Sequence, residues 1–248
     1  MDAELVNKLL EINRTFYSQF GGDFSDTRSS EHLNIEPFRE YLRNDIRLLD
    51  VGCGNGRLAG ALELAGYSLD YVGVDGSVEL LARAESSFSQ LNHIRTEFRY
   101  IEITAPQWNT SLREFAPFDV IVALAVLHHI PSFDLRVRVL HEIHSLLKHD
   151  GIFVMSNWQF TRSERLKEKI VPWERVEIGV AGERNHWRLD NGDYLMDWKR
   201  GGTGYRYVHL IEPKEVEQLA KASGFQVVKQ FYADNDLNLF SILKLKKQ

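Results

Sequence analysis

DVGCGNGR, residues 50–57, is the stretch that decides the fold of this 248-residue chain. It overlaps the end of the apolar run IRLLDV at 46–51, and its three glycines stand at every second position. The next residues, RLAGALELAG, carry apolar side chains at helical spacing and end on Gly66. The stretch therefore predicts a strand, a tight glycine turn and a helix in direct succession.

This strand-turn-helix unit repeats along the chain. Residues 68–77 (SLDYVGVDGS) predict a second strand that ends in an acidic turn, and Ser77 is placed to cap the next helix. Residues 93–104 predict a third strand, and the continuous apolar run at 118–127 predicts a parallel strand buried on both faces. A helix from about Asp134 to Leu147 and a fifth strand, IFVMSNW, complete the series.

Strands that alternate with helices at this spacing predict an α/β fold with a doubly wound, mostly parallel seven-stranded sheet. Ligands of such sheets bind beyond the carboxyl ends of the strands. The last two strands, QVVKQFYA and NLFSILKLKK, are joined by only four residues, so we expect an antiparallel C-terminal strand. We expect one domain over 1–248, with an N-terminal helical cap at 1–45 and a substrate-side insertion at 157–211, where the rhythm stops.

Composition limits the class of protein. Apolar residues make up 44% of the chain and charged residues 26%, as in ordinary globular proteins. The formal net charge of −5 argues against a broadly basic DNA-binding protein. The chain shows neither a secretory leader nor a run of eighteen apolar residues, so we expect no membrane partner and a cytoplasmic location. The lone cysteine, Cys53, fits a reducing compartment.

The glycine turn differs from the dinucleotide-binding pattern G-x-G-x-x-G, because Arg57 occupies its third glycine position. Its G-x-G-x-G form, with Asp50 just before it, resembles motif I of class I S-adenosylmethionine-dependent methyltransferases. That resemblance implies S-adenosylmethionine as cofactor and S-adenosylhomocysteine as product; NAD binding and a purely structural turn are the alternatives. The implied cofactor residues are Asp50, Gly52, Cys53, Gly54, Gly56, Asp75, Gly76, Glu102, Ile103, Leu124 and Ala125.

These residue types suit that cofactor. Glycines let the backbone approach the ligand closely, and Asp50 can orient the cofactor's ammonium group through the loop. Asp75 ends the second strand where an acidic side chain would accept both ribose hydroxyls, and Glu102-Ile103 end the third strand where this class contacts adenine. Because the sulfonium already activates the methyl group, the main task left to the protein is to align an acceptor behind it.

Four further blocks resemble the methyltransferases that esterify the carboxymethyl group of the wobble uridine in tRNA. They are FYSQFGGDFSDTR (16–28), LAVLHHI (124–130) with the helix and strand after it, VPW (171–173) and RYVHLIEPKEVEQLAKASGF (206–225). The implied substrate-side residues are Tyr17, Arg28, Arg206, Tyr207 and His209, and the implied methyl-side residues are Leu124, Ala125, His128 and His129. The chain departs from that family at Val208, where a second tyrosine is common.

The acceptor's chemistry selects the catalytic candidates. A carboxylate is already ionised at neutral pH and needs cations rather than a base, which Arg28 and Arg206 supply by bidentate pairing. A hydroxyl acceptor would need a general base, and His129 or His209 is the candidate. The alternative interpretation is that the arginines make ordinary ion pairs and the histidines are structural donors.

Two clusters of residues have simpler interpretations. Five histidines lie between 128 and 149, but they form no H-E-x-x-H pattern and no cysteine or carboxylate set completes a tetrahedral site, so we expect no metal. Residues 157–211 hold four of the five tryptophans and ten Lys and Arg against eight Asp and Glu. These residues could stack on and steer unpaired bases of an anticodon loop; the alternative is a small aromatic core under a lid.

The sequence favours an S-adenosylmethionine-dependent methyltransferase that acts on a carboxymethyl-type modified wobble uridine in tRNA. Two alternatives remain. One is methyl transfer to a hydroxyl or carboxylate of a small molecule, which the acidic net charge favours; the other is a cofactor-binding protein without activity. The resemblance also implies two partners, tRNA and a small zinc-binding activator subunit, because the eukaryotic tRNA enzymes of that family work with such a subunit.

Overall fold

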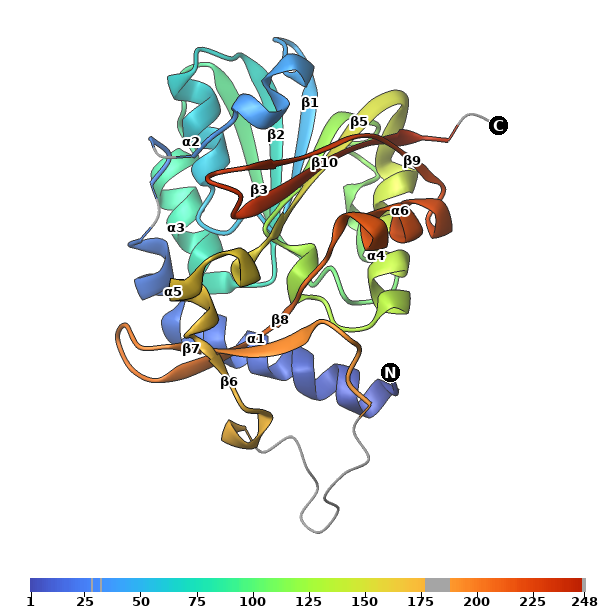
Figure 1. Cartoon of the computed structure of the whole chain (residues 1–248). Coiled ribbons are helices and arrows are strands. Elements are labelled where there is room, and N and C mark those ends of the chain that lie inside the picture. The colour runs from blue at the N-terminus through green and yellow to red at the C-terminus, as the bar shows by residue number, and fades with distance from the viewer. Residues whose placement is uncertain (28, 32, 177–187, 247–248) are drawn as a thin grey trace.

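A seven-stranded sheet forms the centre of the computed structural model, which describes residues 1–27, 29–31, 33–176 and 188–246 (Figure 1). Its strand order is β3-β2-β1-β4-β5-β10-β9. The strands that pair in parallel are β1 (Arg47–Val51), β2 (Leu69–Asp75), β3 (Ile94–Tyr100), β4 (Phe118–Leu124) and β5 (Leu147–Trp158). β10 (Asn238–Leu245) runs antiparallel to both β5 and β9 (Phe225–Ala233). The predicted mostly parallel sheet with an antiparallel C-terminal strand is confirmed.

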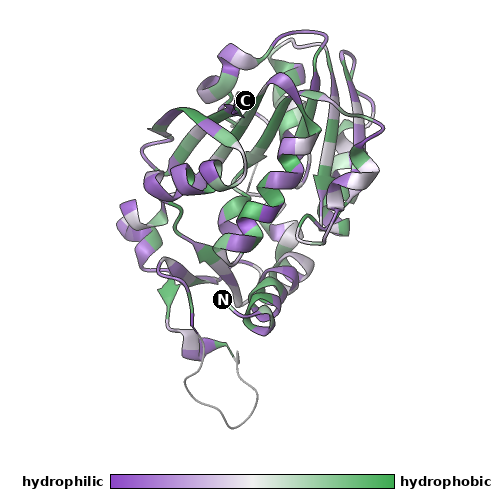
Figure 2. Cartoon of the chain, turned by 90° about the vertical axis from the view of Figure 1, so that its right-hand side faces the viewer, coloured by the Kyte–Doolittle hydropathy of each residue, from purple (hydrophilic) through white to green (hydrophobic). Residues whose placement is uncertain are grey.

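Helices cover both faces of this sheet (Figure 1). On one face, α2 (Arg57–Leu64) and α3 (Val78–Phe88) contribute Leu58 and Leu81 to an apolar core. On the other face, α4 (Phe133–Leu146) and α6 (Pro213–Ala222) contribute Val139 and Val216 to a second core. Figure 2 shows apolar residues along the strands and hydrophilic residues on the outward sides of the helices. The sheet is therefore doubly wound, with its strands buried between two helical layers.

The repeats form as their sequence predicts, with differences at their boundaries: β3 ends at Tyr100 and β4 at Leu124, earlier than the predicted Thr104 and Leu127. The hydroxyl of Ser77 accepts a hydrogen bond from the Leu80 N–H at 3.3 Å, so the predicted helix cap is confirmed. The expected start of the fifth strand at Ile152 is wrong, because β5 begins at Leu147. A bulge explains the difference, since Leu147 pairs with Phe118 whereas Ile152 pairs with Val120.

Sequence reasoning missed a second sheet within residues 157–211. β6 (Ile170–Val171), β7 (Asp193–Trp198) and β8 (Gly204–His209) form an antiparallel sheet, which α5 (Glu164–Lys167) precedes. In the turn between β7 and β8, Gly201 and Gly202 have φ angles of 72° and 148°. The strands are short and the glycines break the pattern between them, so their alternation does not stand out in the sequence.

The N-terminal helix α1 (Ala3–Ser25) lies against β8 (Figure 1). Asn13 makes the main polar contact: its Oδ1 accepts the Tyr207 N–H at 2.9 Å and its Nδ2 donates to the Tyr207 carbonyl at 3.1 Å. Phe16 and Phe20 of α1 pack with Trp198 of β7. A short 3-10 helix, η1 (Glu36–Tyr41), follows α1 along the chain. The second sheet and α1 thus form one unit near the carboxyl ends of the central strands.

Candidate active site

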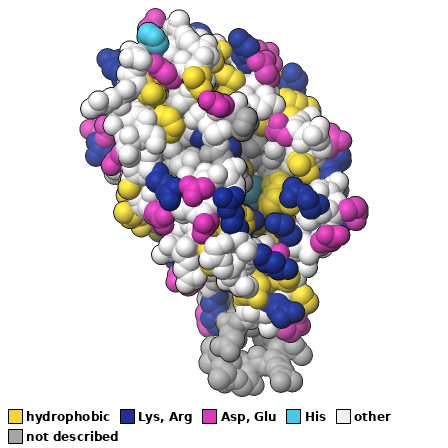
Figure 3. All heavy atoms as spheres, turned by 90° about the vertical axis from the view of Figure 1, so that its left-hand side faces the viewer, with side chains coloured by type: hydrophobic (Ala, Val, Ile, Leu, Met, Phe, Trp, Pro, Cys, Tyr) yellow, Lys and Arg dark blue, Asp and Glu magenta, His cyan; other side chains and the backbone are white. Residues whose placement is uncertain are grey.

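A cavity of about 930 Å³ lies at the carboxyl ends of β1, β2 and β4, bordered by α1. Figure 3 shows a hollow on this face of the molecule, with Lys and Arg side chains close to it. The predicted cofactor residues that line the cavity are Gly52, Cys53, Gly54, Asp75, Gly76, Glu102, Ile103, Leu124 and Ala125. The other two, Asp50 and Gly56, are buried. The structure therefore brings residues from four strand ends together around one space.

The glycine loop has the backbone that its sequence predicts. Gly52 has a φ of 73°, and a Cβ there would lie 2.5 Å from Cγ2 of Val126, so this position requires glycine. Gly54 has a φ of 56°, and a Cβ there would meet no described atom within 4 Å. The backbone at Gly54 is therefore open to a ligand that approaches from the cavity.

Asp75 is fixed at the end of β2 by the backbone around it. Its Oδ2 accepts the Gly54 N–H at 2.9 Å and its Oδ1 accepts the Ser77 N–H at 2.8 Å. Burial raises the pKa of Asp75, against the lowering effect of these backbone N–H groups. Because a carboxylate can accept about four hydrogen bonds, Asp75 can also accept both hydroxyls of a ribose in the cavity.

Asp50 is 3% exposed, and its Oδ2 accepts the Tyr71 hydroxyl at 2.6 Å. Burial raises the pKa of Asp50 to about 7, although the hydrogen bond from Tyr71 and the positive charge of Arg57 act in the opposite direction. A cation placed over the loop would favour the ionised form of Asp50.

Glu102 lines the cavity at the end of β3, but its carboxylate is already engaged. It accepts the Arg14 Nε–H at 3.1 Å and the Thr104 hydroxyl at 2.7 Å. Sequence reasoning missed two apolar residues here, Val78 and Tyr100, which are 69% and 59% exposed and line the same cavity. The signal for Val78 was its place directly after the capping Ser77. Together with Ile103, these side chains offer an apolar surface to a purine base.

Arg206 is the cation at the far end of the cavity. It is 4% exposed, and its guanidinium lies over four aromatic rings, at 4.9 Å from Phe16, 5.8 Å from Phe24, 5.6 Å from Trp158 and 5.4 Å from Trp198. Burial lowers the pKa of Arg206, whereas Tyr17 and Asp197 raise it. Since an arginine stays protonated even when its pKa falls, Arg206 is a caged positive charge that lines the cavity.

The tryptophans of residues 157–211 therefore fit the simpler interpretation. Trp158 and Trp198 surround Arg206, and Trp173 packs against Tyr207 with ring centroids 6.5 Å apart. Trp187 lies outside the described residues. The aromatic side chains that the structure describes build a core around a cation.

Tyr17 and His129 meet beside Arg206 in the cavity wall. The Tyr17 hydroxyl lies 3.2 Å from Nε2 of His129, and Nδ1 of His129 lies 3.2 Å from the Tyr207 carbonyl oxygen. A carbonyl can only accept, so Nδ1 carries the proton, and when the ring is neutral its Nε2 accepts the Tyr17 hydroxyl. Tyr17 and His129, which both line the cavity, form a pair linked to the backbone of β8.

The end of β4 has the strained backbone of a ligand-binding turn. Ala125 has a φ of 60°, and its N–H lies 3.0 Å from the hydroxyl of Ser156. Leu124, Ala125 and His129 line the cavity as predicted. His128 also lines it but is only 1% exposed, and its Nδ1 accepts the Trp158 N–H at 3.3 Å.

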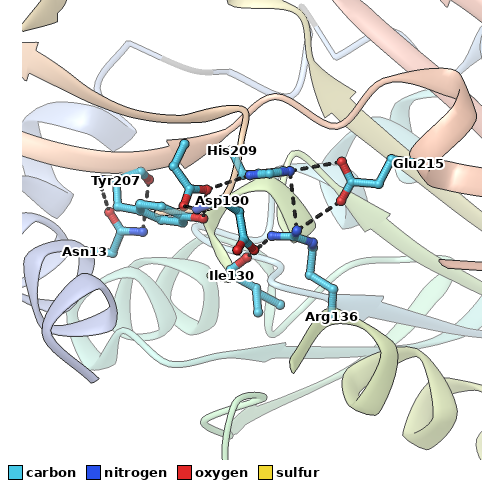
Figure 4. Close-up of polar contacts among 8 residues, drawn as sticks. Asn13, Ile130, Arg136, Asp190, Tyr207, His209 and Glu215 are labelled. Carbon is cyan, nitrogen blue, oxygen red and sulfur yellow. Dashed lines mark hydrogen bonds and ion pairs between the residues drawn. The ribbon is translucent and has the colours of Figure 1, made fainter. Parts of the chain in front are cut away.

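The structure does not bring two of the predicted substrate residues, Tyr207 and His209, to the described cavity. Figure 4 shows them in a buried polar cluster with Arg136 and Glu215, and neither residue is among those that line the described cavity. The Tyr207 hydroxyl donates to Asp193 at 2.7 Å; Nδ1 of His209 lies 2.6 Å from the same Asp193 oxygen, and its Nε2 lies 2.9 Å from Glu215. Side chains alternate across a strand, so Arg206 points to the cavity whereas Tyr207 and His209 point away from it.

His209, predicted as a candidate general base, is therefore engaged by two carboxylates and does not line the described cavity. Burial lowers the pKa of His209, but its hydrogen bonds to Asp193 and Glu215 outweigh burial and raise it. Arg28, the remaining predicted catalytic and substrate residue, lies outside the described residues. No group of three or more His, Cys, Asp and Glu side chains in the described part of the chain is arranged to hold a metal ion.

A doubly wound sheet with an antiparallel C-terminal strand, a G-x-G-x-G loop at its carboxyl edge and an acidic residue at the end of the second strand is the architecture of a class I methyltransferase. The chain belongs to the methyltransferase domain family, which matches residues 30–230. It is an S-adenosylmethionine-dependent methyltransferase. The cavity fits the cofactor, because Gly54 leaves the space beside the loop open and Asp75 is held where a ribose can reach it.

Relatives with different acceptors share this family. A ubiquinone biosynthesis O-methyltransferase of Azorhizobium caulinodans is 26% identical in an alignment that covers 80% of this chain and 71% of that protein. A tRNA (carboxymethyluridine(34)-5-O)-methyltransferase of Xenopus tropicalis is 27% identical in an alignment that covers 94% of this chain and only 36% of that protein. A solved S-adenosylmethionine-dependent methyltransferase of Methanosarcina mazei has a TM-score of 0.62 at 22% identity, over 87% of this chain and 100% of the other.

The described helices include none that is both long and apolar enough to cross a membrane.

Cofactor affinity should increase as the pH rises through about 7, because Asp50 must lose its proton to attract the cofactor's ammonium group. Burial holds the pKa of Asp50 at about 7 in the free protein, so binding at lower pH has to displace a proton. We expect the affinity to fall by up to roughly tenfold per pH unit below about 7. Calorimetric titration from about pH 5.5 to 7.5 checks this. Asp50→Asn is the control, because titration of the cofactor itself affects both proteins equally. The same dependence of cofactor affinity on pH in both proteins would contradict the role of Asp50.

Proposed function

We propose that this methyltransferase esterifies the carboxylate of a carboxymethyl-type modified wobble uridine in tRNA. The observation that carries the proposal is Arg206, a caged cation that lines the cavity beside Tyr17 and His129. When bound, S-adenosylmethionine supplies a methyl group that its sulfonium activates. The residues of the chain then have to hold one acceptor oxygen in line with that methyl group.

The charge state of Arg206 supports an anionic acceptor. Arg206 forms no ion pair among the described residues, and Asp197, a carboxylate that raises its pKa, is itself paired with Lys199 at 3.0 Å. A buried cation is costly unless an anion or aromatic rings compensate for the lost water. A substrate carboxylate would accept hydrogen bonds from the guanidinium in the fork geometry that arginine favours. Because such pairing also weakens the nucleophile, positioning has to dominate the rate.

The arrangement of His129 also suits a carboxylate. Its Nδ1–H donates to the Tyr207 carbonyl, and its Nε2 accepts the Tyr17 hydroxyl. A hydroxyl acceptor would have to compete with Tyr17 for this nitrogen, whereas a carboxylate needs no base. The Tyr17 hydroxyl is then one of the groups that position the acceptor.

Two observations support tRNA as the molecule that carries the carboxylate. The Xenopus relative is named for carboxymethyluridine at position 34 of tRNA, and it aligns over 94% of this chain. The cavity is open at the surface, and Figure 3 shows Lys and Arg side chains around the hollow, where they can attract phosphates. Local cations can act in this way although the whole chain carries a formal net charge of −5.

Transfer of labelled methyl from S-adenosylmethionine to total tRNA, compared with a small-molecule extract, tests the acceptor. We expect label in the tRNA fraction, and nucleoside analysis should place it on a uridine derivative. Label confined to the small-molecule extract would contradict the proposal. Cofactor binding with no label in either fraction would support a cofactor-binding protein without activity.

A second candidate acceptor is the hydroxyl or carboxylate of a small molecule. The observation that favours it is the similarity to the ubiquinone biosynthesis enzyme, which extends over 71% of that protein, about twice the share of the tRNA relative. For a hydroxyl acceptor, His129 would remove the proton after Tyr17 moves aside. The same labelling experiment separates the two candidates.

A further inference from the structure

Arg57 is a cation with no role in the methyl transfer proposed above. It is the first residue of α2, directly after the glycine loop, and it lines the main cavity. It also lines a neighbouring polar cavity of about 570 Å³ that includes Ser25 and Arg83, so it stands in the wall between the two. The Arg57 side chain has no hydrogen bond or ion pair among the residues that the structure describes. A half-buried guanidinium with free donors is suited to binding an anion.

The other cations of the cavity are already engaged. Among the Lys and Arg side chains that line its described wall, Arg14 is paired with Glu102 at 3.1 Å, at the end of β3. Arg206 is held among the aromatic rings at the acceptor end. Arg57, directly after the glycine loop, is therefore the remaining cation among the described residues that line the cavity.

A bound cofactor would bring its own anion to this part of the cavity. Asp75 at the end of β2 would hold the ribose, and the methyl group would have to face the proposed acceptor side, where Tyr17 and Arg206 lie. The amino-acid part of the cofactor would then lie over the glycine loop, between these two points. That part is a zwitterion, so it brings both an ammonium group and a carboxylate.

The charges around the glycine loop favour different positions for the carboxylate and the ammonium group of the cofactor. Burial lowers the pKa of Arg57, and the carboxylates of Asp50 and Asp234 only partly offset this effect. The N-cap of α2 is Gly56, which supplies no side-chain hydrogen bond to the first turn, so the positive end of this helix adds to the attraction for an anion. Asp50 carries the opposite charge when it is ionised, so it would attract the ammonium group.

We propose that Arg57 binds the carboxylate of the methionyl part of S-adenosylmethionine and so makes the enzyme selective for a cofactor that carries this group. The inference rests on the cofactor part of the proposed function and is independent of the acceptor. It predicts that the enzyme discriminates against decarboxylated S-adenosylmethionine, which keeps the sulfonium, the ribose, the adenine and the ammonium group.

Calorimetric binding of the two ligands to wild type and to Arg57→Met tests this inference. We expect wild type to bind S-adenosylmethionine more tightly than the decarboxylated ligand by about ten- to a hundredfold, the range for a charge-assisted hydrogen bond. In Arg57→Met this ratio should fall to within about threefold of one, mainly through weaker binding of S-adenosylmethionine. Arg57→Lys should keep part of the ratio, because it keeps the charge but loses the planar fork.

Arg83→Met is the matched control. Arg83 lines the neighbouring cavity but not the main one, and its guanidinium is paired with Asp26 at 2.8 Å. We expect the wild-type ratio in this variant. If Arg57→Met unfolds, Arg57→Lys decides instead: we expect its ratio to lie between the wild-type ratio and one, and an unchanged wild-type ratio would overturn the proposal.

An unchanged ratio in a folded Arg57→Met protein would overturn the proposal. A higher acceptor KM with an unchanged ratio would also overturn it, because Arg57 would then bind the acceptor at the neighbouring cavity rather than the cofactor. The ratio of the two ligand affinities is measured without a methyl acceptor. Failure of the tRNA proposal, seen as label in small molecules, would therefore leave this inference intact.

Discussion

Replacing Arg206 by methionine should reduce methyl transfer about a hundredfold or more, while cofactor affinity stays within about twofold of wild type. Methionine fills much of the aromatic cage but removes the charge and all the donors. Loss of one partner from a buried, hydrogen-bonded charge pair typically costs about 2–5 kcal/mol. The loss should appear in the transfer rate, because Arg206 lies on the acceptor side of the cavity and the cofactor residues lie on the other side.

Arg162→Met is the matched control for Arg206. Arg162 also lies over an aromatic ring, that of Tyr232 at 3.8 Å, but its side chain is 42% exposed and does not line the described cavity. We expect its variant to transfer methyl groups at the wild-type rate. Joint loss of transfer, cofactor binding and thermal stability in Arg206→Met would show that Arg206 is a structural residue of the cage.

Replacing Asp75 by alanine should weaken cofactor binding by about thirtyfold to a thousandfold, because two charge-assisted hydrogen bonds to the ribose are lost. Asp75 also holds the Gly54 and Ser77 amides, so the glycine loop loses part of its support in the same variant. Binding of S-adenosylhomocysteine, followed by calorimetry, measures the effect without any acceptor.

Asp70→Asn is the control in the same strand. Asp70 accepts Arg95 Nε–H at 2.5 Å at the opposite end of β2 and does not line the described cavity. We expect this variant to bind S-adenosylhomocysteine as wild type does. Binding by Asp75→Ala within about threefold of wild type would show that the ribose is held elsewhere.

The cofactor side could be predicted from sequence because its signals are local. The glycines at 52, 54 and 56 and the acidic end of β2 lie next to the strands that they follow, and the parallel sheet brings these ends together. The cap at Ser77 is equally local. Arg57 also stood out in the sequence, as the residue in place of a third glycine, but only the structure shows that no described residue pairs with its guanidinium.

The acceptor side could be predicted only in part because tertiary packing assembles it. The cage around Arg206 takes Phe16 and Phe24 from α1, Trp158 from the end of β5 and Trp198 from β7. Tyr207 and His209 were predicted to face the acceptor because the strand β8 was not recognised, whereas the structure places them away from the described cavity. Once Gly204–His209 is known to be a strand, its alternation separates Arg206 from Tyr207 and His209.

The most direct test of the central claim compares one tRNA with and without 5-carboxymethyluridine at the wobble position. The purified enzyme is given labelled S-adenosylmethionine, and the tRNA product is then treated with mild alkali. The account predicts label only in the carboxymethyluridine-bearing tRNA, released as methanol because a methyl ester is labile to base. Equal label in both tRNAs, or label that resists alkali, would contradict methylation of a wobble carboxylate.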